Sequence, residues 1–114
     1  MTHPAGPVPT LTPVELKERL ERGDELVLLD VREAHEREIA DLPDCGQVHI
    51  PMAFVPTRLD ELDPDREIVV YCRSGGRSAW AAQVLAERGF TKVWNLEGGV
   101  LGWREQVDPT LPAY

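Results

Sequence analysis

Residues 68–78 read IVVYCRSGGRS, a stretch in which an apolar run leads straight into a cysteine and a glycine-rich loop. The β-branched and aromatic residues at 68–71 predict a buried strand, the strongest strand signal in the chain. The alanine-rich segment 78–88 predicts a helix that stops at Gly89, a residue able to adopt positive φ. The stretch therefore predicts a strand, a tight loop and a helix, with Cys72 at the carboxyl end of the strand.

The segments on either side repeat this alternation of strands and helices. Residues 12–15, TPVE, form a helix-start signal with Thr12 as N-cap, and the helix should stop at Gly23. Further strands are expected at 26–29, 48–50 and 92–94, and further helical segments at 33–39, 56–62 and 100–103. The strands are uniformly apolar, which favours an α/β fold with a parallel sheet covered by helices on both faces. In such sheets, ligands bind at the carboxyl ends of the strands, where Cys72 is expected.

The size of the chain fits one compact domain. Its 114 residues are 42% hydrophobic, enough for a single core and too little for two. We expect an extended N-terminal arm over 1–10, the folded domain over 11–107 and a C-terminal tail over 108–114. The start lacks the features of a signal peptide, and apolar runs fall short of the roughly 20 residues that cross a bilayer. A soluble, cytoplasmic protein with reduced cysteines is therefore expected.

The charge distribution argues against some partners and favours others. The net charge of −8 argues against nucleic acid and anionic membranes. Residues 1–66 hold 15 acidic and 7 basic side chains, whereas 67–114 hold 5 of each. Between Glu67 and Glu87 the only formal charges are Arg73 and Arg77, so a small positive island surrounds Cys72. The histidines and cysteines have no metal-ligand spacing, and we expect neither a metal nor a cofactor.

The cysteine loop has the features of an anion cradle. A helix that begins near Ser78 presents unpaired N–H groups and the positive end of its dipole. Gly75 and Gly76 allow the backbone to curl so that further N–H groups point inward. A thiolate gains hydrogen bonds there that a neutral thiol does not, which lowers the pKa of the thiol and activates it as a nucleophile. Arg73 and Arg77 add positive charge and can hold an oxyanion.

Plainer interpretations exist for both cysteines. A cysteine that follows a strand is often a buried small hydrophobe, and the spacing C-x₄-R also arises by chance. The paired glycines and the absence of nearby acids favour the reactive interpretation for Cys72. Cys45 lies in a Pro/Asp/Gly loop without basic neighbours, so an incidental thiol is favoured there. The alternative for Cys45 is a resolving cysteine that forms a disulfide with Cys72.

Taken together and in order, the motifs of the chain resemble those of a single-domain rhodanese, a sulfurtransferase. The resemblance runs from about residue 11 to residue 104. Its motifs are LLDVRE at 28–33, VHIP at 48–51, VVYCRSGGRS at 69–78, RGF at 88–90, and LEGG at 96–99 followed by a tryptophan.

The resemblance implies a small rhodanese-like domain around a roughly five-stranded parallel sheet, with Cys72 as the catalytic sulfur carrier. It implies that Cys72 takes the outer sulfur of a small anionic donor, thiosulfate or a persulfide, and becomes a persulfide itself. The acceptor would be a thiol, cyanide or a protein. The resemblance also assigns substrate and anion binding to the rest of the loop: Arg73, Ser74, Gly75, Gly76, Arg77 and Ser78. Related phosphatases and arsenate reductases have C-x₅-R loops, whereas Cys72 and Arg77 are separated by four residues.

Three charged residues of the DVRE motif, Asp30, Arg32 and Glu33, are expected to be mainly structural, because charged groups at a strand end usually satisfy each other and the backbone.

Two alternatives to thiosulfate sulfurtransfer stay open. One is a relay protein that takes persulfide from a cysteine desulfurase and passes it to a biosynthetic partner. The other is a noncatalytic rhodanese-like binding module, which is disfavoured because such modules often lack the cysteine.

Overall fold

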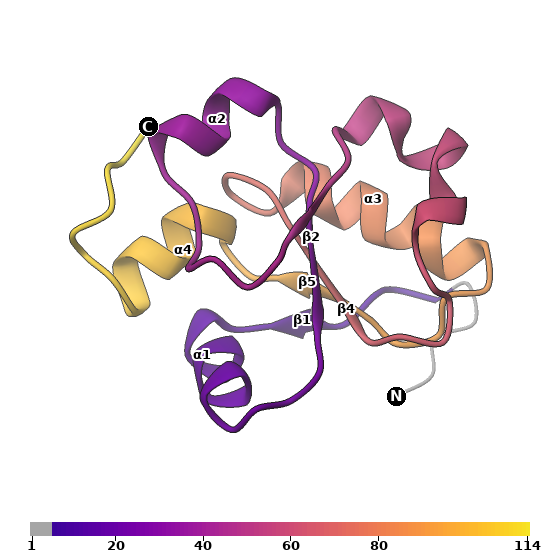
Figure 1. The fold of residues 1–114 in the computed structure, drawn as a ribbon, viewed down its shortest axis with the longest axis horizontal. Helices are drawn as coiled ribbons and strands as arrows, with labels where there is room; N and C mark the ends of the chain where they lie inside the picture. Colours follow the sequence, from indigo (N-terminus) through magenta and orange to yellow (C-terminus); the bar gives the residue numbers. More distant parts are fainter. Residues whose placement is uncertain (1–5) are drawn as a thin grey trace.

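The five parallel strands of the protein form one sheet, seen in the computed structural model of residues 6–114 (Figure 1). Its order is β1-β5-β4-β2-β3. The strands are β1 (Thr10–Leu11), β2 (Val27–Asp30), β3 (Val48–His49), β4 (Ile68–Tyr71) and β5 (Val93–Leu96). The expected α/β fold with a five-stranded parallel sheet is confirmed.

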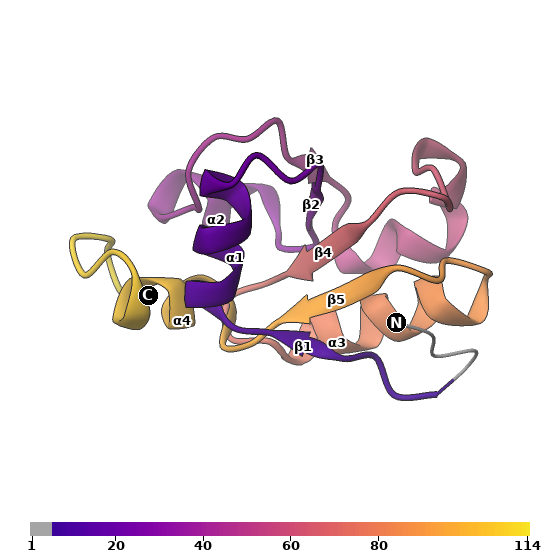
Figure 2. The ribbon, with the colours of Figure 1, turned by 90° about the horizontal axis from the view of Figure 1, so that it is seen from below.

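Helices cover both faces of this sheet, as Figure 2 shows from a second direction. They are α1 (Pro13–Glu21), α2 (Ala34–Ile39), α3 (Gly76–Glu87) and α4 (Gly99–Gln106), with 3₁₀ segments η1 (Met52–Thr57) and η2 (Leu59–Glu61). α1 and α4 pack together on one face, and α3 packs with η1 on the other. Within residues 6–114, the helices are too short or too polar to cross a bilayer.

Strand β4 lies at the centre and explains why its sequence shows no alternation. It pairs with β2 on one side and β5 on the other, and its four residues are fully buried. Ile68 and Val70 face the core cluster beneath α3, whereas Val69 and Tyr71 face the cluster beneath α1 and α4. Both faces of the strand are therefore dry, so an apolar side chain is favoured at every position.

The predicted start of the first helix is confirmed in atomic detail. The Thr12 hydroxyl accepts the N–H of Glu15 at 3.2 Å, and the Glu15 carboxylate accepts the N–H of Thr12 at 2.9 Å. This reciprocal capping box satisfies two N–H groups that the helix itself leaves unpaired. At the other end the chain leaves the helix through Gly23, whose φ is +86°.

The structure corrects the predicted start of the helix that follows the cysteine loop. Helix α3 begins at Gly76 rather than near Ser78, because Gly75 adopts a φ of +110° and turns the chain directly into the helix. The arm predicted over 1–10 contains Thr10, which belongs to β1 and pairs with Asn95 of β5. A two-residue strand is too short to show a period in sequence. The first five residues of that arm lie outside the described part of the chain.

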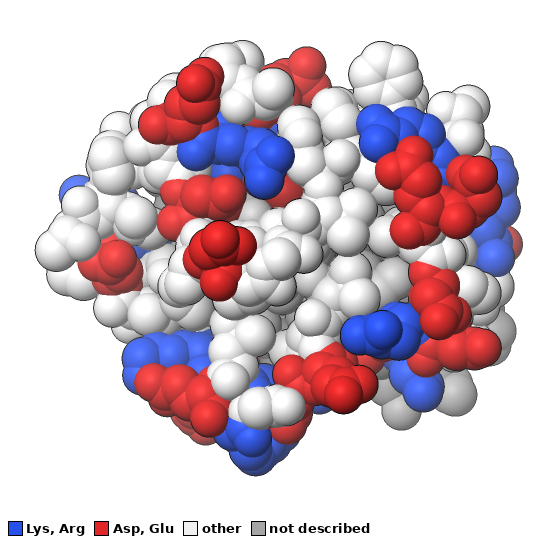
Figure 3. Space-filling model, viewed as in Figure 1, with Lys and Arg blue, Asp and Glu red and all other residues white. Residues whose placement is uncertain are grey.

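Surface charges of both signs are interspersed on the face drawn in Figure 3. Exposed or half-exposed pairs include Lys17 with Glu21 and Arg58 with Glu61. On this face, the acidic excess of the sequence is therefore accompanied by neighbouring positive charge. Such exposed pairs contribute little to stability.

Gly99 allows α4 to approach the loop that contains Cys72. The N–H of Val100 donates to the carbonyl oxygen of Cys72 at 2.9 Å, and the N–H of Leu101 donates to that of Arg73 at 3.0 Å. A Cβ added to Gly99, whose φ is +58°, would lie 2.4 Å from the carbonyl oxygen of Cys72. Only a residue without a side chain fits between the helix and the loop.

We expect Gly99→Ala to lower the free energy of unfolding by about 3 kcal/mol or more, because the clash is with rigid backbone. Gly89→Ala is the matched control: its φ is +94°, but an added Cβ would meet no atom within 4 Å. The control should lose only about 1–2 kcal/mol from the left-handed backbone. Urea unfolding of both variants measures the difference, and equal losses would contradict the close approach.

Candidate functional site

The sulfur of Cys72 lies at the carboxyl edge of the sheet, one residue beyond the last residue of β4. Cys72 is 1% exposed. The N–H of Gly75 donates to Sγ at 3.1 Å, and the hydroxyl of Ser78 lies 3.3 Å from it. The loop therefore curls around the sulfur and replaces the water that burial removes.

These hydrogen bonds favour the charged form of the Cys72 sulfur. Burial by itself raises the pKa of Cys72, because a buried thiolate loses its hydration. Hydrogen bonds from the Ser78 hydroxyl and from the N–H groups of Ser78, Gly75 and Ser74 outweigh this effect, so the pKa is lowered from its usual value. The sequence interpretation gave the two arginines a share in this effect. The hydrogen-bond donors of the loop are the largest contributions to the lowering, and Arg77 also interacts electrostatically with Cys72.

Arg77 is held by a carboxylate that sequence reasoning did not identify. Its Nη1 and Nη2 donate to the two oxygens of Glu36 at 2.7 Å and 2.8 Å. Glu36 belongs to α2 and is buried. This bidentate pair ties the first turn of α3 to α2, because a planar guanidinium matches a planar carboxylate. In the sequence, Glu36 is one acid among several in a charged segment, with no signal to distinguish it.

Arg73 contacts the end of the C-terminal segment. Its Nε donates to the main-chain oxygen of Tyr114, and its guanidinium carbon lies 5.3 Å from the centre of the Tyr114 ring. The hydroxyl of Tyr114 accepts from Nη1 of Arg32 at 2.7 Å and donates to Glu36 at 3.2 Å. In Figure 1 the chain returns from α4 to end beside α2. Tyr114 lies far from these partners in sequence, so no local pattern could have predicted it.

The charged residues of the DVRE motif divide into buried and exposed groups. Asp30 and Arg32 are fully buried and paired, with Nη2 of Arg32 2.9 Å from Oδ2 of Asp30. Nη1 of Arg32 also donates to the carbonyl oxygen of Ala40 at 2.8 Å. Glu33 is exposed and precedes α2, where its N–H donates to Glu36 at 2.9 Å. These contacts agree with the structural role expected for Asp30 and Arg32.

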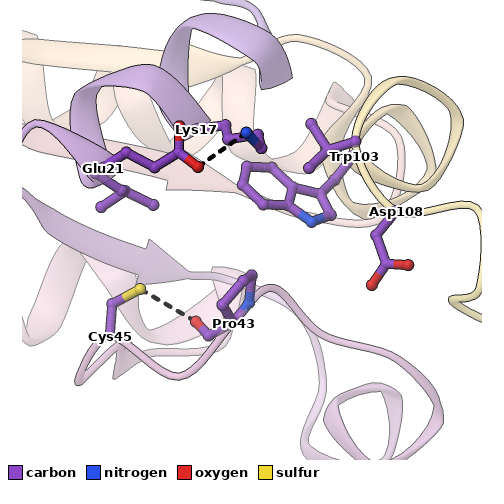
Figure 4. A pocket seen from close by; sticks show the side chains of 8 residues that line it. Lys17, Glu21, Pro43, Cys45, Trp103 and Asp108 are labelled. Atoms are coloured by element: carbon purple, nitrogen blue, oxygen red, sulfur yellow. Dashed lines mark hydrogen bonds and ion pairs between the residues drawn. The ribbon is translucent and has the colours of Figure 1, made fainter.

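Cys45 lies in a different environment from Cys72. Both thiols are free. Burial, followed by the nearby Asp44 and Asp41 carboxylates, raises the pKa of Cys45, which makes its thiol less reactive. Cys45 lines a pocket of about 350 Å³ together with residues of α1 and α4, including Trp103 (Figure 4). Cys72 does not line this pocket. The environment of Cys45 is that of the incidental thiol favoured from the sequence.

Within residues 6–114, no group of three or more histidine, cysteine or acidic side chains is arranged to hold a metal ion. Two buried carboxylates of this region are instead paired with arginines. Glu36 pairs with Arg77, and Asp30 pairs with Arg32. Arg73, which is exposed, has no side-chain carboxylate partner among the described residues. The chemistry available at this site is therefore that of a sulfur nucleophile surrounded by hydrogen-bond donors.

Comparison with known proteins points to one family. The sequence profile of the rhodanese-like domain matches residues 12–106. A sulfurtransferase of Allochromatium vinosum is 39% identical over 84% of this chain and 88% of its own length. A putative sulfurtransferase of Bacillus subtilis, YtwF, is 43% identical over 82% of this chain and 88% of that protein. The structure of the human single-domain sulfurtransferase TSTD1 is 26% identical, with a TM-score of 0.74, over 87% of this chain and 97% of that one.

We expect Glu36→Gln to lower the free energy of unfolding by about 1–3 kcal/mol at pH 7, because it removes the charge that pairs with Arg77. The hydrogen bonds from Arg77 lower the pKa of Glu36 to about 2. A carboxylate with a lowered pKa stabilises the fold above its usual pKa, and this stability is lost as the pH falls toward the folded-state value. The difference between wild type and variant should therefore shrink from about pH 4.5 downward.

Chemical unfolding at a series of pH values measures this difference. Glu61→Gln is the control, because Glu61 forms an exposed pair with Arg58 and should change stability very little. A loss in Glu36→Gln that stays constant down to about pH 2 would contradict a charged Glu36.

Proposed function

This chain belongs to the rhodanese-like domain family, and we propose that it is a sulfurtransferase that forms a persulfide on Cys72. The proposed donor is thiosulfate or a persulfide, and the proposed acceptor is a thiol, cyanide or a protein. Its relatives are named sulfurtransferases, which supports sulfur transfer in general. The observation that carries the proposal is the sulfur of Cys72, buried at a strand end and surrounded by hydrogen-bond donors.

The first half of the reaction is loading of the sulfur. The Cys72 thiolate attacks the outer sulfur of thiosulfate, so that one S–S bond forms and the S–S bond of thiosulfate breaks. The bonding electron pair leaves with sulfite, and the protein keeps a persulfide with one negative charge. No proton is transferred, because the thiolate is already ionised and sulfite leaves as an anion. The lowered pKa of Cys72 is what this step requires.

The second half returns the protein to its starting state. A thiophilic acceptor attacks the outer sulfur of the persulfide, and the Cys72 thiolate leaves with the electron pair. Two half-reactions through a covalent intermediate give ping-pong kinetics. Donor and acceptor then use the same site in turn, so the protein needs no site that holds both at once.

The other residues of the loop have distinct proposed roles. Arg73 is exposed beside Cys72 and is the guanidinium that we assign to the anionic donor. Arg77 closes the loop through its bond to Glu36. Ser74, Gly75 and Ser78 supply donors to the sulfur, and Gly76 opens α3 without a side chain over the loop. With four residues between Cys72 and Arg77, we propose that the loop is too tight for a phosphoryl group.

We also propose that residues 11–107 are the rhodanese-like domain and that 108–114 form a tail lying against it. Nε of Arg104 donates to the carbonyl oxygen of Leu111 at 2.7 Å, which holds this tail to α4. A cytoplasmic location is part of the proposal, since two free thiols persist best in a reducing compartment.

We expect the wild-type protein to gain the mass of one sulfur atom on treatment with thiosulfate, and Cys72→Ser to gain none. Cys45→Ser is the matched control and should load like the wild type. The pKa of Cys45 is raised, so its thiol should stay unloaded in the wild type as well. Intact-mass measurement with release by cyanide checks the result. Loading of Cys72→Ser, or no loading of the wild type, would refute a persulfide on Cys72.

Two donors separate the thiosulfate enzyme from the relay protein. Turnover on thiosulfate is compared with transfer of ³⁵S from a cysteine desulfurase charged with labelled cysteine. Turnover on thiosulfate that matches or exceeds transfer from the desulfurase supports the enzyme. Transfer only from the desulfurase would favour a relay. The absence of both thiosulfate turnover and ³⁵S transfer would favour a binding module.

A further inference from the structure

The hydroxyl of Ser78 lies among three acceptors but has one proton. Its Oγ is 2.6 Å from Oδ1 of Asn95, 3.2 Å from the carbonyl oxygen of Gly75 and 3.3 Å from Sγ of Cys72. Ser78 is fully buried, so water does not supply a further partner. The proton can be directed at only one of these acceptors at a time. Asn95 and the sulfur therefore compete for it.

The orientation of the Asn95 amide follows from its other contact. Nδ2 donates to the carbonyl oxygen of Gly75 at 3.2 Å, which places Oδ1 toward Ser78. The reversed amide would set two oxygens against each other at that distance. Asn95 lies in β5 and is buried at 8% exposure. It contacts both Gly75 and Ser78, the two residues whose donors lie closest to the sulfur.

The sulfur of Cys72 changes its charge during sulfur transfer. In the empty state Sγ is a thiolate and is the strongest acceptor near Ser78. In the loaded state the negative charge lies on the outer sulfur, and Sγ is a neutral disulfide-like atom that accepts weakly. A buried hydroxyl that loses its acceptor without a replacement is costly. Oδ1 of Asn95 is in place to provide that replacement.

We propose that Asn95 is a positioning residue that accepts the Ser78 proton when Cys72 carries sulfur and yields it to the Cys72 sulfur when the site is empty. This inference rests on the proposed function. Asn95 thereby balances the two states of the cycle: it stabilises the loaded state and withdraws part of the stabilisation of the empty thiolate. Without this balance, each thiolate would be a weaker nucleophile and the loaded state would be disfavoured.

The charged groups around Cys72 stay the same in this exchange. Arg77 of α3 interacts electrostatically with Cys72 and is paired with Glu36 of α2, and Arg73 follows Cys72 in the loop. β5 presents the neutral Asn95, and α4 presents the main chain of Val100 to the Cys72 carbonyl. Replacing Asn95 by a neutral residue therefore changes hydrogen bonding to Ser78 and Gly75 and leaves these charges in place.

The first measurement is the pH dependence of Cys72 alkylation by iodoacetamide, in a Cys45→Ser background so that one thiol reacts. Four proteins are compared: the parent, Asn95→Leu, Ser78→Ala and the double variant. Asn95→Leu frees the Ser78 proton for the thiolate, so alkylation below the midpoint should be about three- to tenfold faster and the midpoint lower. Ser78→Ala should raise the midpoint, and the double variant should behave as Ser78→Ala.

The control is Trp94→Phe, also in β5, which loses a 2.7 Å hydrogen bond from the indole N–H to Glu67 and should leave the midpoint unchanged. A midpoint in Asn95→Leu that is unchanged or raised overturns the proposal. The proposal also fails if Asn95→Leu shifts the midpoint equally in the parent and in the Ser78→Ala variant. Asn95→Ala is the second variant if thermal unfolding shows that Asn95→Leu does not fold.

The second measurement is the loaded fraction at a fixed ratio of thiosulfate to sulfite, read by intact mass. Asn95→Leu should load about three- to tenfold less at equilibrium, because its loaded state lacks the acceptor for Ser78. An unchanged loaded fraction would overturn the role of Asn95 in the cycle. If the wild type fails to load, the proposed function fails, while the alkylation series still decides whether Asn95 and Ser78 compete with the sulfur.

Discussion

A sulfur anion at the end of a buried strand requires hydrogen-bond donors, because burial removes the water that would otherwise stabilise its charge. Strand β4 is dry on both faces, so the residue that follows it starts in an apolar environment. The loop supplies these hydrogen-bond donors, which are main-chain N–H groups and the hydroxyl of Ser78. Gly75 turns the backbone through positive φ so that these donors point inward and α3 can begin at once. The position of the strand and the conformation of the loop therefore depend on each other.

The loop is held in place by contacts from separate parts of the chain. From one side, the first turn of α4 donates two main-chain N–H groups to the carbonyl oxygens of Cys72 and Arg73. From another, Glu36 fixes Arg77, and the hydroxyl of Tyr114 bridges Glu36 and Arg32. These partners bind the outside of the loop and leave its interior donors directed at the sulfur. In the proposed reaction the sulfur changes its charge, and a rigid cradle loses little conformational freedom in that change, which is the general advantage of preorganisation.

Much of the fold was predictable because its signals are local. The capping box at Thr12, the continuous apolar run of β4 and the turn at Gly89 each occupy a few consecutive residues, and the structure confirms them. The site was predictable only in part. Cys72 and its loop are consecutive in sequence, whereas Glu36 and Asn95 contact that loop from other elements. A buried acid in a charged helix has the same local sequence features as an exposed one.

The sequence by itself determined a parallel α/β domain with one cysteine between a dry strand and a glycine loop, because periodicity, capping and loop composition act over short distances. The tertiary structure alone decided which groups meet that cysteine. It paired Arg77 with Glu36, placed Tyr114 against Arg73 and set Asn95 beside Ser78. These contacts follow from strand order and helix packing, which join residues distant in sequence and leave no local pattern. The position of the cysteine is therefore determined locally, and its environment is determined by the whole fold.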